Sequence, residues 1–312
     1  MKSKNPINKH SLTIDSAALT DQGQRRKLNE DAVFQWTEQI DNGGNVGLYI
    51  VCDGFGGHGA GDVASNLAVQ TISTESTELF TALKTISKHA STQVSSKTVL
   101  QYIEAAIKKA NDEIRHHAQA HPQDASNMGT TLILAVVYNG IAYLANVGDS
   151  RAYVWRDGEI VQLTRDHSMA AELVASGEID RCEFPGHPFS HILYRSLGAE
   201  NDLTVDLFEW ELQPQDKLLL CSDGLWQAFP DNDDLADWFD VAADARQLCR
   251  CLLVEANERY GEDNISAVVV EVDEKLHPAV QDVLFQVAPM LVKPSSTVCN
   301  ETALEDTFLG LR

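Results

Sequence analysis

Apolar positions along this chain form short runs typical of strands and longer stretches with helical spacing. Four runs of strand length follow one another between residues 130 and 164: Thr131–Tyr138, Ile141–Val147, Arg151–Trp155 and Glu159–Leu163. Asn139-Gly140 separates the first pair of runs, and Asp157-Gly158 separates the second pair. Such dipeptides are strong hairpin signals, because both turn residues must take positive φ. The pattern predicts a meander of antiparallel strands.

Two long helices are predicted before this meander. Apolar residues recur at helical spacing over two stretches, from Val63 to Ile72 and from Val99 to Ile114. The segment Thr85–Lys97 between them is rich in Ser, Thr and Lys, and we interpret it as a loop.

Shorter helices are predicted after the meander. Ser168 is placed to cap a short helix that ends at Gly177. The following stretch, Glu178–Leu197, has no clear period and is interpreted as a surface excursion. Apolar spacing then predicts a short helix around Leu235–Phe239 and a longer one around Leu248–Ala256.

Three more apolar runs have strand character: Val46–Cys52, Lys217–Cys221 and Ile265–Val272. The order along the chain is therefore strands, two helices, the meander, then strand, helix and strand. This order predicts an α+β layered fold with mostly antiparallel sheets.

The character of the chain changes at Glu274. Over His277–Leu291, apolar residues fall on one helical face: Val280, Val283, Leu284, Val287 and Leu291. A stretch rich in Ser, Thr and Asn follows. We therefore expect one main domain over residues 12–273 and a C-terminal appendage with an amphipathic helix over residues 274–312.

Composition narrows the class of protein. A chain of 312 residues with 44% hydrophobic content can bury a large core. Its net charge of −22 makes binding to nucleic acid unfavourable. The six cysteines form no CxxC pair, and two of them, Cys52 and Cys221, lie in apolar runs as reduced core thiols do.

Neither a leader nor a membrane segment is expected. Residues Met1–Ser11 lack an apolar core of the signal-peptide type, and the longest apolar stretch, Leu132–Val137, is too short to span a bilayer. We interpret the chain as cytoplasmic, with no membrane partner.

The candidate chemistry lies in five acidic motifs: Asn29-Glu30-Asp31, Asp53-Gly54, Gly148-Asp149-Ser150, Ser222-Asp223-Gly224 and Asp263-Asn264. Four of them adjoin a strand-like run. A carboxylate at the end of a buried strand is costly unless it is paired. One Asp-Gly could be a simple turn, but five such motifs favour convergence on a site for hard cations, Mg²⁺ or Mn²⁺. Arg26 next to these carboxylates points to a phosphate ligand.

Seven stretches in order resemble the metal-dependent serine/threonine protein phosphatases of the 2C type, in their bacterial form, over about Leu12 to Asp273. They are Asp21–Asp31, Asp53–His58, Met128–Thr131, Asn146–Arg151, Leu163–Ser168, Ser222–Leu225 and Gly261–Asn264. The resemblance implies two antiparallel sheets packed as a sandwich and flanked by pairs of helices, with metal ions at one end. It also implies hydrolysis of phosphoserine and phosphothreonine in proteins by attack of a metal-bridging water.

The resemblance assigns a role to each matching residue. Asp53 resembles the carboxylate that bridges two metal ions, with Asp223 and Asp263 completing the first site. Glu30 and the Gly54 carbonyl resemble the ligands of the second site. The remaining assignments are Asp31 as a holder of metal-bound water, Asp149 with Asp223 at a third metal site, and Arg26 as the phosphate clamp.

The resemblance also bears on two histidines and one segment. His58 is the candidate general acid for the leaving alkoxide, although a structural hydrogen bond would suit its position equally well. His167 is interpreted as structural. The stretch Glu178–Leu197 occupies the position of the family's flap.

Partners and alternatives follow from the same resemblance. The expected partners are phosphorylated proteins and a cognate Ser/Thr kinase, the expected cofactors are two Mn²⁺ or Mg²⁺ ions plus a third, and the expected state is a monomer. One alternative is a non-catalytic regulator that binds phosphoproteins, against which the intact Glu30, Asp53, Asp223 and Asp263 argue. The other alternative is a phosphomonoesterase for small molecules.

Overall fold

The computed structural model describes residues 12–40, 44–87, 94–125, 127–180, 183–184 and 187–274, and the side chain of His58 is outside this description. All of these residues belong to a unit that ends at Glu274. The predicted appendage, including its amphipathic helix, lies outside the described residues. Within them, no helix is long and apolar enough to cross a membrane.

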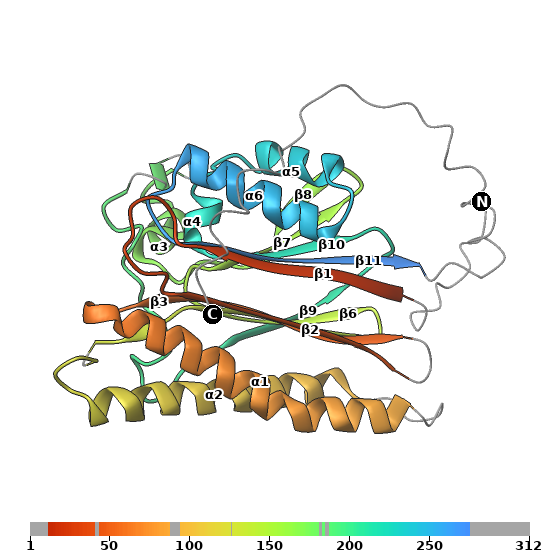
Figure 1. Cartoon of the computed structure of the whole chain (residues 1–312), viewed down its shortest axis with the longest axis horizontal. Helices are drawn as coiled ribbons and strands as arrows, with labels where there is room; N and C mark the ends of the chain where they lie inside the picture. Colours follow the sequence, from red (N-terminus) through yellow and green to blue (C-terminus); the bar gives the residue numbers. More distant parts are fainter. Residues whose placement is uncertain are drawn as a thin grey trace, which may run out of the picture. The chain divides into compact units, whose positions relative to one another are not determined.

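Two antiparallel sheets form the centre of this unit (Figure 1). The first sheet has the order β1 (Leu12–Asp21), β11 (Ile265–Glu274), β10 (Lys217–Cys221), β7 (Arg151–Arg156) and β8 (Glu159–Gln162). The second has the order β2 (Asp31–Gln39), β3 (Asn45–Phe55), β5 (Leu132–Tyr138), β6 (Ile141–Val147) and β9 (Asp206–Glu211), with the short β4 (Gly129–Thr130) paired to β3. The predicted sandwich of two antiparallel sheets is confirmed.

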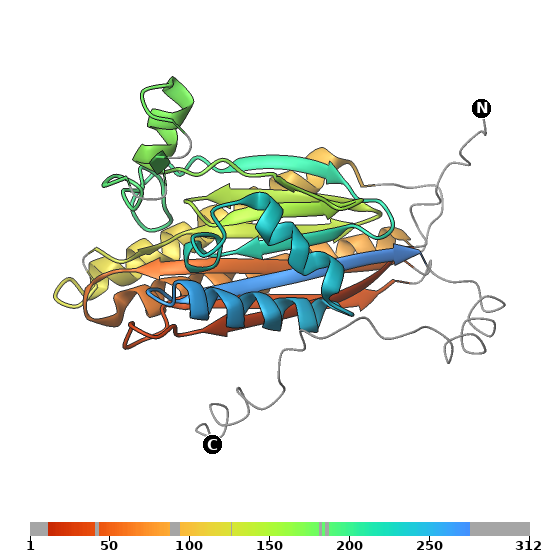
Figure 2. The ribbon, with the colours of Figure 1, turned by 90° about the horizontal axis from the view of Figure 1, so that it is seen from above.

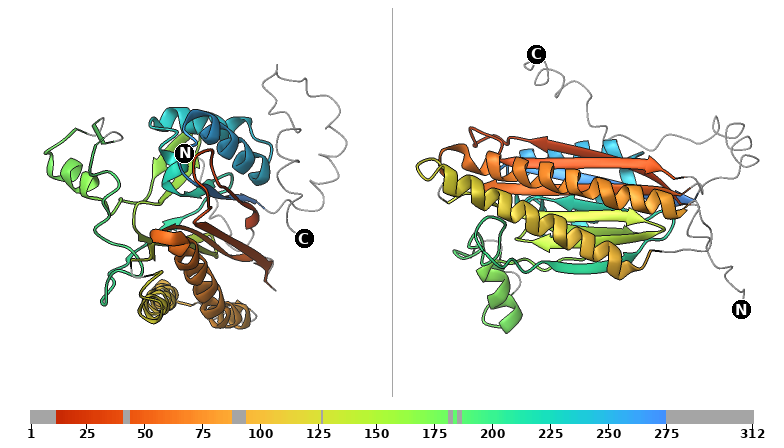
Figure 3. Two further views of the ribbon diagram at one scale, coloured as in Figure 1. Left: turned by 60° about the vertical axis from the view of Figure 1, so that its left-hand side comes forward. Right: turned by 90° about the horizontal axis from the view of Figure 1, so that it is seen from below.

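Helices cover the outer face of each sheet. The long helices α1 (Ala60–Ser87) and α2 (Ser96–Ala120) lie side by side against the second sheet (Figure 3). The first sheet is covered by α4 (Asp223–Trp226), α5 (Asn232–Val241) and α6 (Ala245–Arg259). Helix α3 (Met169–Ser176) projects to one side of the sandwich, as Figure 2 shows. Its predicted ends are confirmed, because Ser168 caps it and Gly177 closes it at φ 76°.

Alternation along β3 separates two layers of the core. Tyr49 and Val51 pack between the two sheets, whereas Ile50 and Cys52 pack toward α1 and α2. Cys52 therefore lies on the face opposite to its neighbour Asp53, as the sequence predicted. Because both faces of β3 are covered, its run of apolar residues is continuous rather than alternating.

The predicted meander is only half right. Its two hairpins form with the expected turns, since Asn139, Gly140, Asp157 and Gly158 all have positive φ. However, β5 and β6 belong to the second sheet, while β7 and β8 belong to the first. The chain crosses between sheets at Gly148, where φ is 105° and a Cβ would lie 2.7 Å from the side chain of Thr131. This crossing carries Asp149 to the end of the sandwich.

Candidate active site

The strand register brings the five acidic motifs to one end of the sandwich. In the second sheet, Asp31 at the start of β2 is the direct partner of Asp53 near the end of β3. In the first sheet, Cys221 at the end of β10 pairs with Ala267 near the start of β11. Antiparallel pairing thus places the starts of β2, β7 and β11 beside the ends of β3, β6 and β10. Each acidic motif lies at one of these junctions.

Glu30 and Asp31 are held by groups from the other sheet. The backbone N–H of Glu30 donates to Asn264 Oδ1 at 2.8 Å, and the hydroxyl of Ser222 donates to Asp31 Oδ2 at 2.8 Å. Asp31 is only 6% exposed. Burial, together with the nearby carboxylate of Asp223, raises the pKa of Asp31 to about 7. Protein groups alone therefore do not compensate for the buried charge.

Asp53 lies at the centre of the cluster. Its backbone N–H donates to Thr131 Oγ1 at 3.0 Å, which fixes the end of β3. Burial raises the pKa of Asp53 well above its usual value, and the nearby carboxylates of Asp31 and Asp223 raise it further, followed by Asp149. These mutual effects show that the acidic side chains from both sheets share one electrostatic environment.

Asp223 has a partner on one carboxylate oxygen, whereas Asp263 has one on each, since its Oδ1 also accepts from the backbone N–H of Asn264 at 2.8 Å. Gln227 Nε2 donates to Asp223 Oδ2 at 2.7 Å, and Arg26 Nη2 donates to Asp263 Oδ2 at 2.6 Å. Burial and the charge of Asp263 raise the pKa of Asp223 to about 6. The pKa of Arg26 is raised by its hydrogen bond to Asp263, which outweighs the effect of burial.

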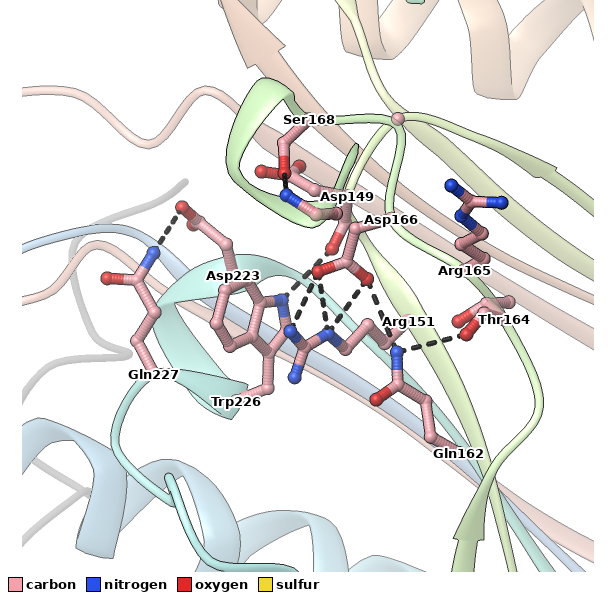
Figure 4. A network of polar contacts seen from close by, with 12 residues as sticks. Asp149, Arg151, Gln162, Thr164, Arg165, Asp166, Ser168, Asp223, Trp226 and Gln227 are labelled. Atoms are coloured by element: carbon pink, nitrogen blue, oxygen red, sulfur yellow. Dashed lines mark hydrogen bonds and ion pairs between the residues drawn. The ribbon is translucent and has the colours of Figure 1, made fainter. Parts of the chain in front are cut away.

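Asp149 is buried where the chain crosses between the sheets. Trp226 Nε1 donates to its backbone oxygen at 3.0 Å, and the guanidinium of Arg151 lies 3.5 Å from the centre of the Trp226 ring (Figure 4). Arg151 in turn forms a bidentate pair with Asp166. Burial raises the pKa of Asp149 well above its usual value, and Asp223 adds to this. The Asp149 carboxylate therefore belongs to the same cluster.

The two neighbouring arginines differ as the sequence predicted. Arg26 forms an ion pair with Asp263 inside the cluster, and the charges of Asp53 and Asp223 also raise its pKa. Arg25 pairs with Glu262, and its side chain is 72% exposed. Only Arg26 is therefore placed to meet a ligand of the acidic cluster.

Sequence reasoning missed the role of Gly61. The carboxylate of Glu30 lies at the start of α1, where the backbone N–H of Gly61 bonds to it and lowers its pKa, partly offsetting the larger effect of burial. A Cβ on Gly61 would lie 2.7 Å from Glu30 Oε1, and one on Gly54 would lie 2.1 Å from the Gly61 oxygen. The dense glycines between residues 54 and 61 were the available signal for this close approach.

The sequence indicated Asn264 only as part of a motif, and the structure shows that its side chain holds a neighbouring loop in place. Its Oδ1 accepts from the Glu30 backbone, and its Nδ2 donates to the backbone oxygens of Gln22 and Leu28 at 2.8 and 3.0 Å. One buried amide thus fixes the loop that carries Arg26 and Glu30. His167 has a similar supporting place, because its Nδ1 accepts from Gly148 N–H at 3.0 Å and its Nε2 lies 3.2 Å from Asp206.

The donor set suits hard divalent cations. Within the described part of the acidic cluster, three buried carboxylate oxygens have no hydrogen-bond partner: Glu30 Oε1, Asp31 Oδ1 and Asp223 Oδ1. Unpartnered buried oxygens of this kind are costly, and an oxygen-seeking cation would satisfy them. Among the described residues, no three acidic, His or Cys side chains are close enough together to form a ready-made metal cage.

Comparison with known proteins identifies the family. The model of the family "Protein phosphatase 2C" matches residues 22–254. The serine/threonine phosphatase stp of Listeria welshimeri is 37% identical over 257 residues, covering 81% of this chain and 93% of that protein. The serine/threonine protein phosphatase PstP of Mycobacterium tuberculosis is 30% identical over 277 residues, covering 88% of this chain but only 48% of PstP.

Solved structures agree with this result. The crystal structure of the Mycobacterium tuberculosis phosphatase PstP/Ppp has a TM-score of 0.70 at 29% identity and covers 84% of this chain and 99% of that one. A structure of the PstP catalytic domain with two manganese ions has a TM-score of 0.68 at 28% identity and covers 85% and 100%. The chain therefore belongs to the protein phosphatase 2C family and is a metal-dependent serine/threonine protein phosphatase of the bacterial type.

Proposed function

We propose that the acidic end of the sandwich is the site of phosphoester hydrolysis, with residue roles as the sequence assigned them. Asp53, Asp223 and Asp263 would hold one divalent ion, and Glu30, Asp53 and the Gly54 carbonyl a second. The observation that carries this proposal is the set of buried, unpartnered carboxylate oxygens beside Arg26. Manganese is the ion present in the related PstP structure.

Two ions bound there would supply an activated water and neutralise charge on the phosphoryl oxygens. The protein's own contribution would be to hold the side chains that contact substrate and water in position before the substrate binds. Arg26 has donors besides the Nη2 that bonds to Asp263, and a guanidinium can bind two phosphate oxygens at once. Asp31, whose carboxylate accepts a hydrogen bond from Ser222, would orient a water molecule in the site. His58 remains the candidate donor of a proton to the leaving oxygen.

We also propose a third ion at Asp149 and Asp223. Support comes from the electrostatic coupling of these two buried carboxylates and from the unpartnered Asp223 Oδ1. Asp223 would then be a ligand of two ions; its Oδ1 has no hydrogen-bond partner, and its Oδ2 accepts from Gln227.

The biological setting stays a prediction. Phosphorylated proteins are the substrates that the family implies, while the cognate Ser/Thr kinase, the monomeric state and the cytoplasmic location rest on the sequence alone. Comparing turnover of phosphopeptides with that of nucleotides and sugar phosphates would separate a protein phosphatase from a small-molecule phosphomonoesterase. A non-catalytic regulator would hydrolyse none of these compounds.

The first prediction concerns metal dependence. Removing divalent ions with a chelator leaves the buried carboxylates repelling one another, so hydrolysis of p-nitrophenyl phosphate should stop and the melting temperature should fall. Excess Mn²⁺ should restore both. Asp223→Asn should reduce the Mn²⁺-dependent rise in melting temperature, measured by differential scanning fluorimetry. Full activity in excess chelator would exclude a metal mechanism.

The second prediction tests the phosphate clamp with a matched pair of variants. Arg26→Ala should raise KM for p-nitrophenyl phosphate about tenfold, because it removes a charged hydrogen bond at a half-exposed position. Arg25→Ala removes the same charge one residue earlier and should change KM less than about twofold, since its side chain points to Glu262. If both variants changed KM equally, Arg26 would act only through its general charge and not as a phosphate clamp.

The third prediction separates the proposed third ion from the first two. Asp149→Ala should lower kcat by at least about tenfold, while calorimetry should still detect two tightly bound Mn²⁺ ions. The control is Asp157→Asn, which keeps a turn residue that tolerates positive φ and lies away from the cluster. An unchanged kcat in Asp149→Ala would mean that a third ion has no part in turnover.

A further inference from the structure

A cavity of about 380 Å³ lies between α3 and the chain that follows Asp223. Its walls come from three segments: Ala171, Val174 and Ala175 on α3, Phe184 in the flap region, and Trp226 to Asn232 after β10. The stretch between β8 and α3, including Arg165, also lines it.

Several polar groups around the cavity are already engaged. Arg151 is bound to Asp166, and Gln162 Nε2 donates to the Thr164 oxygen at 3.0 Å (Figure 4). Arg165 is paired with Glu172 on α3 at 2.7 Å. An occupant would gain little from offering these groups further hydrogen bonds.

The remaining wall is apolar and aromatic. It is made by alanine methyl groups, Val174, Pro230 and the rings of Phe184 and Trp226, whose centres are 5.9 Å apart. Such a wall favours an aliphatic or aromatic group and disfavours a charged one, which would lose its hydration without a partner.

The cavity adjoins the acidic cluster, because two neighbouring side chains contact both. Gln227 lines the cavity and donates to Asp223 Oδ2, while Trp226 lines it and donates to the Asp149 oxygen. An extended peptide advances by about 3.3–3.6 Å per residue, so three residues cover about 10 Å. A side chain within about three positions of a phosphorylated residue is therefore within reach of the cavity.

The surrounding surface is also suited to a protein substrate. Four large apolar side chains on α3 and the flap are exposed: Met169, Phe189, Ile192 and Tyr194. Exposed apolar side chains gathered on one projecting segment are typical of surfaces that contact other proteins. The flap is anchored by bridges from Ser168 to Leu193 and from Thr130 to Leu197, so this surface has a defined position.

We propose that this cavity is a specificity subsite that receives an aliphatic or aromatic side chain of the phosphoprotein substrate, within about three residues of the phosphorylated position. The inference rests on the proposed site of hydrolysis at the acidic cluster. It names the substrates that this chain prefers: phosphoserine or phosphothreonine with a nearby apolar residue.

The test is a set of phosphopeptides that carry one leucine at each position from −4 to +4 in an otherwise alanine and glycine background. With Mn²⁺ present, one position should raise kcat/KM about tenfold over the peptide without leucine. Equal values at all positions would overturn the subsite. Failure of the wild-type protein to hydrolyse any phosphopeptide would instead count against the proposed function.

Two variants on α3 locate the effect. Ala175→Trp fills the cavity from an exposed position and should bring the ratio of kcat/KM for the preferred and leucine-free peptides close to one. Ser176→Trp adds the same side chain next to it but outside the cavity wall, and should keep the wild-type ratio. Because the ratio is taken within one variant, it is independent of changes in overall activity. If Ala175→Trp does not fold, Ala175→Glu provides the same comparison, and a ratio that persists would overturn the proposal.

Discussion

The structure depends on one electrostatic constraint, namely that carboxylates from both sheets are buried together at one end of the sandwich. Asp31, Asp149 and Asp223 are each less than 10% exposed, and the charges raise one another's pKa values. Among the described residues, Arg26 is the cation that forms an ion pair with a carboxylate of this cluster, and that carboxylate is Asp263. Such a cluster is stable only with compensating cations or bound protons.

The fold holds these charges in place with neutral polar groups. Ser222, which follows β10 of the first sheet, bonds to Asp31 of the second sheet, and Asn264 bonds to the Glu30 backbone in the same way. These links cross between sheets at the acidic end. They fix the carboxylates without neutralising them, which leaves unpartnered oxygens for metal ions. The same arrangement explains why glycine is needed at positions 54 and 61, where backbones of β3 and α1 approach closely.

The proposed substrate cavity beside α3 shares two residues with the acidic cluster. Trp226 and Gln227 follow Asp223 directly, so the chain that positions a metal ligand also forms a wall of the cavity beside α3. A substrate side chain in that cavity would contact the same residues that hold Asp149 and Asp223. Substrate choice and the geometry of the acidic cluster would then be physically linked.

Much of this architecture could be predicted from sequence, because local signals were strong. The turns at Asn139-Gly140 and Asp157-Gly158, the cap at Ser168 and the continuous apolar run of β3 all follow from local chemistry. The division of the meander between two sheets could not be predicted, since hairpin signals say nothing about which sheet a hairpin joins. The strand β9 was missed, because its residues are only half-buried and carry little apolar pattern.

The acidic residues of the site were also predictable, since each adjoins a motif or a strand end. Their supports were not, because Ser222, Gly61 and Asn264 act through contacts with residues far away in sequence. The cavity beside α3 is a tertiary feature as well. Its wall joins α3, the flap region and the segment after Asp223, and no local pattern connects them.

The most direct test of the central claim is anomalous diffraction at the manganese edge from crystals grown with Mn²⁺. If the two-ion site is correct, one manganese peak should lie among Asp53, Asp223 and Asp263, and a second among Glu30, Asp53 and the Gly54 oxygen. The two-ion site would be contradicted if the peaks lay elsewhere in the molecule, or if the fully active enzyme showed no manganese at the acidic end of the sandwich.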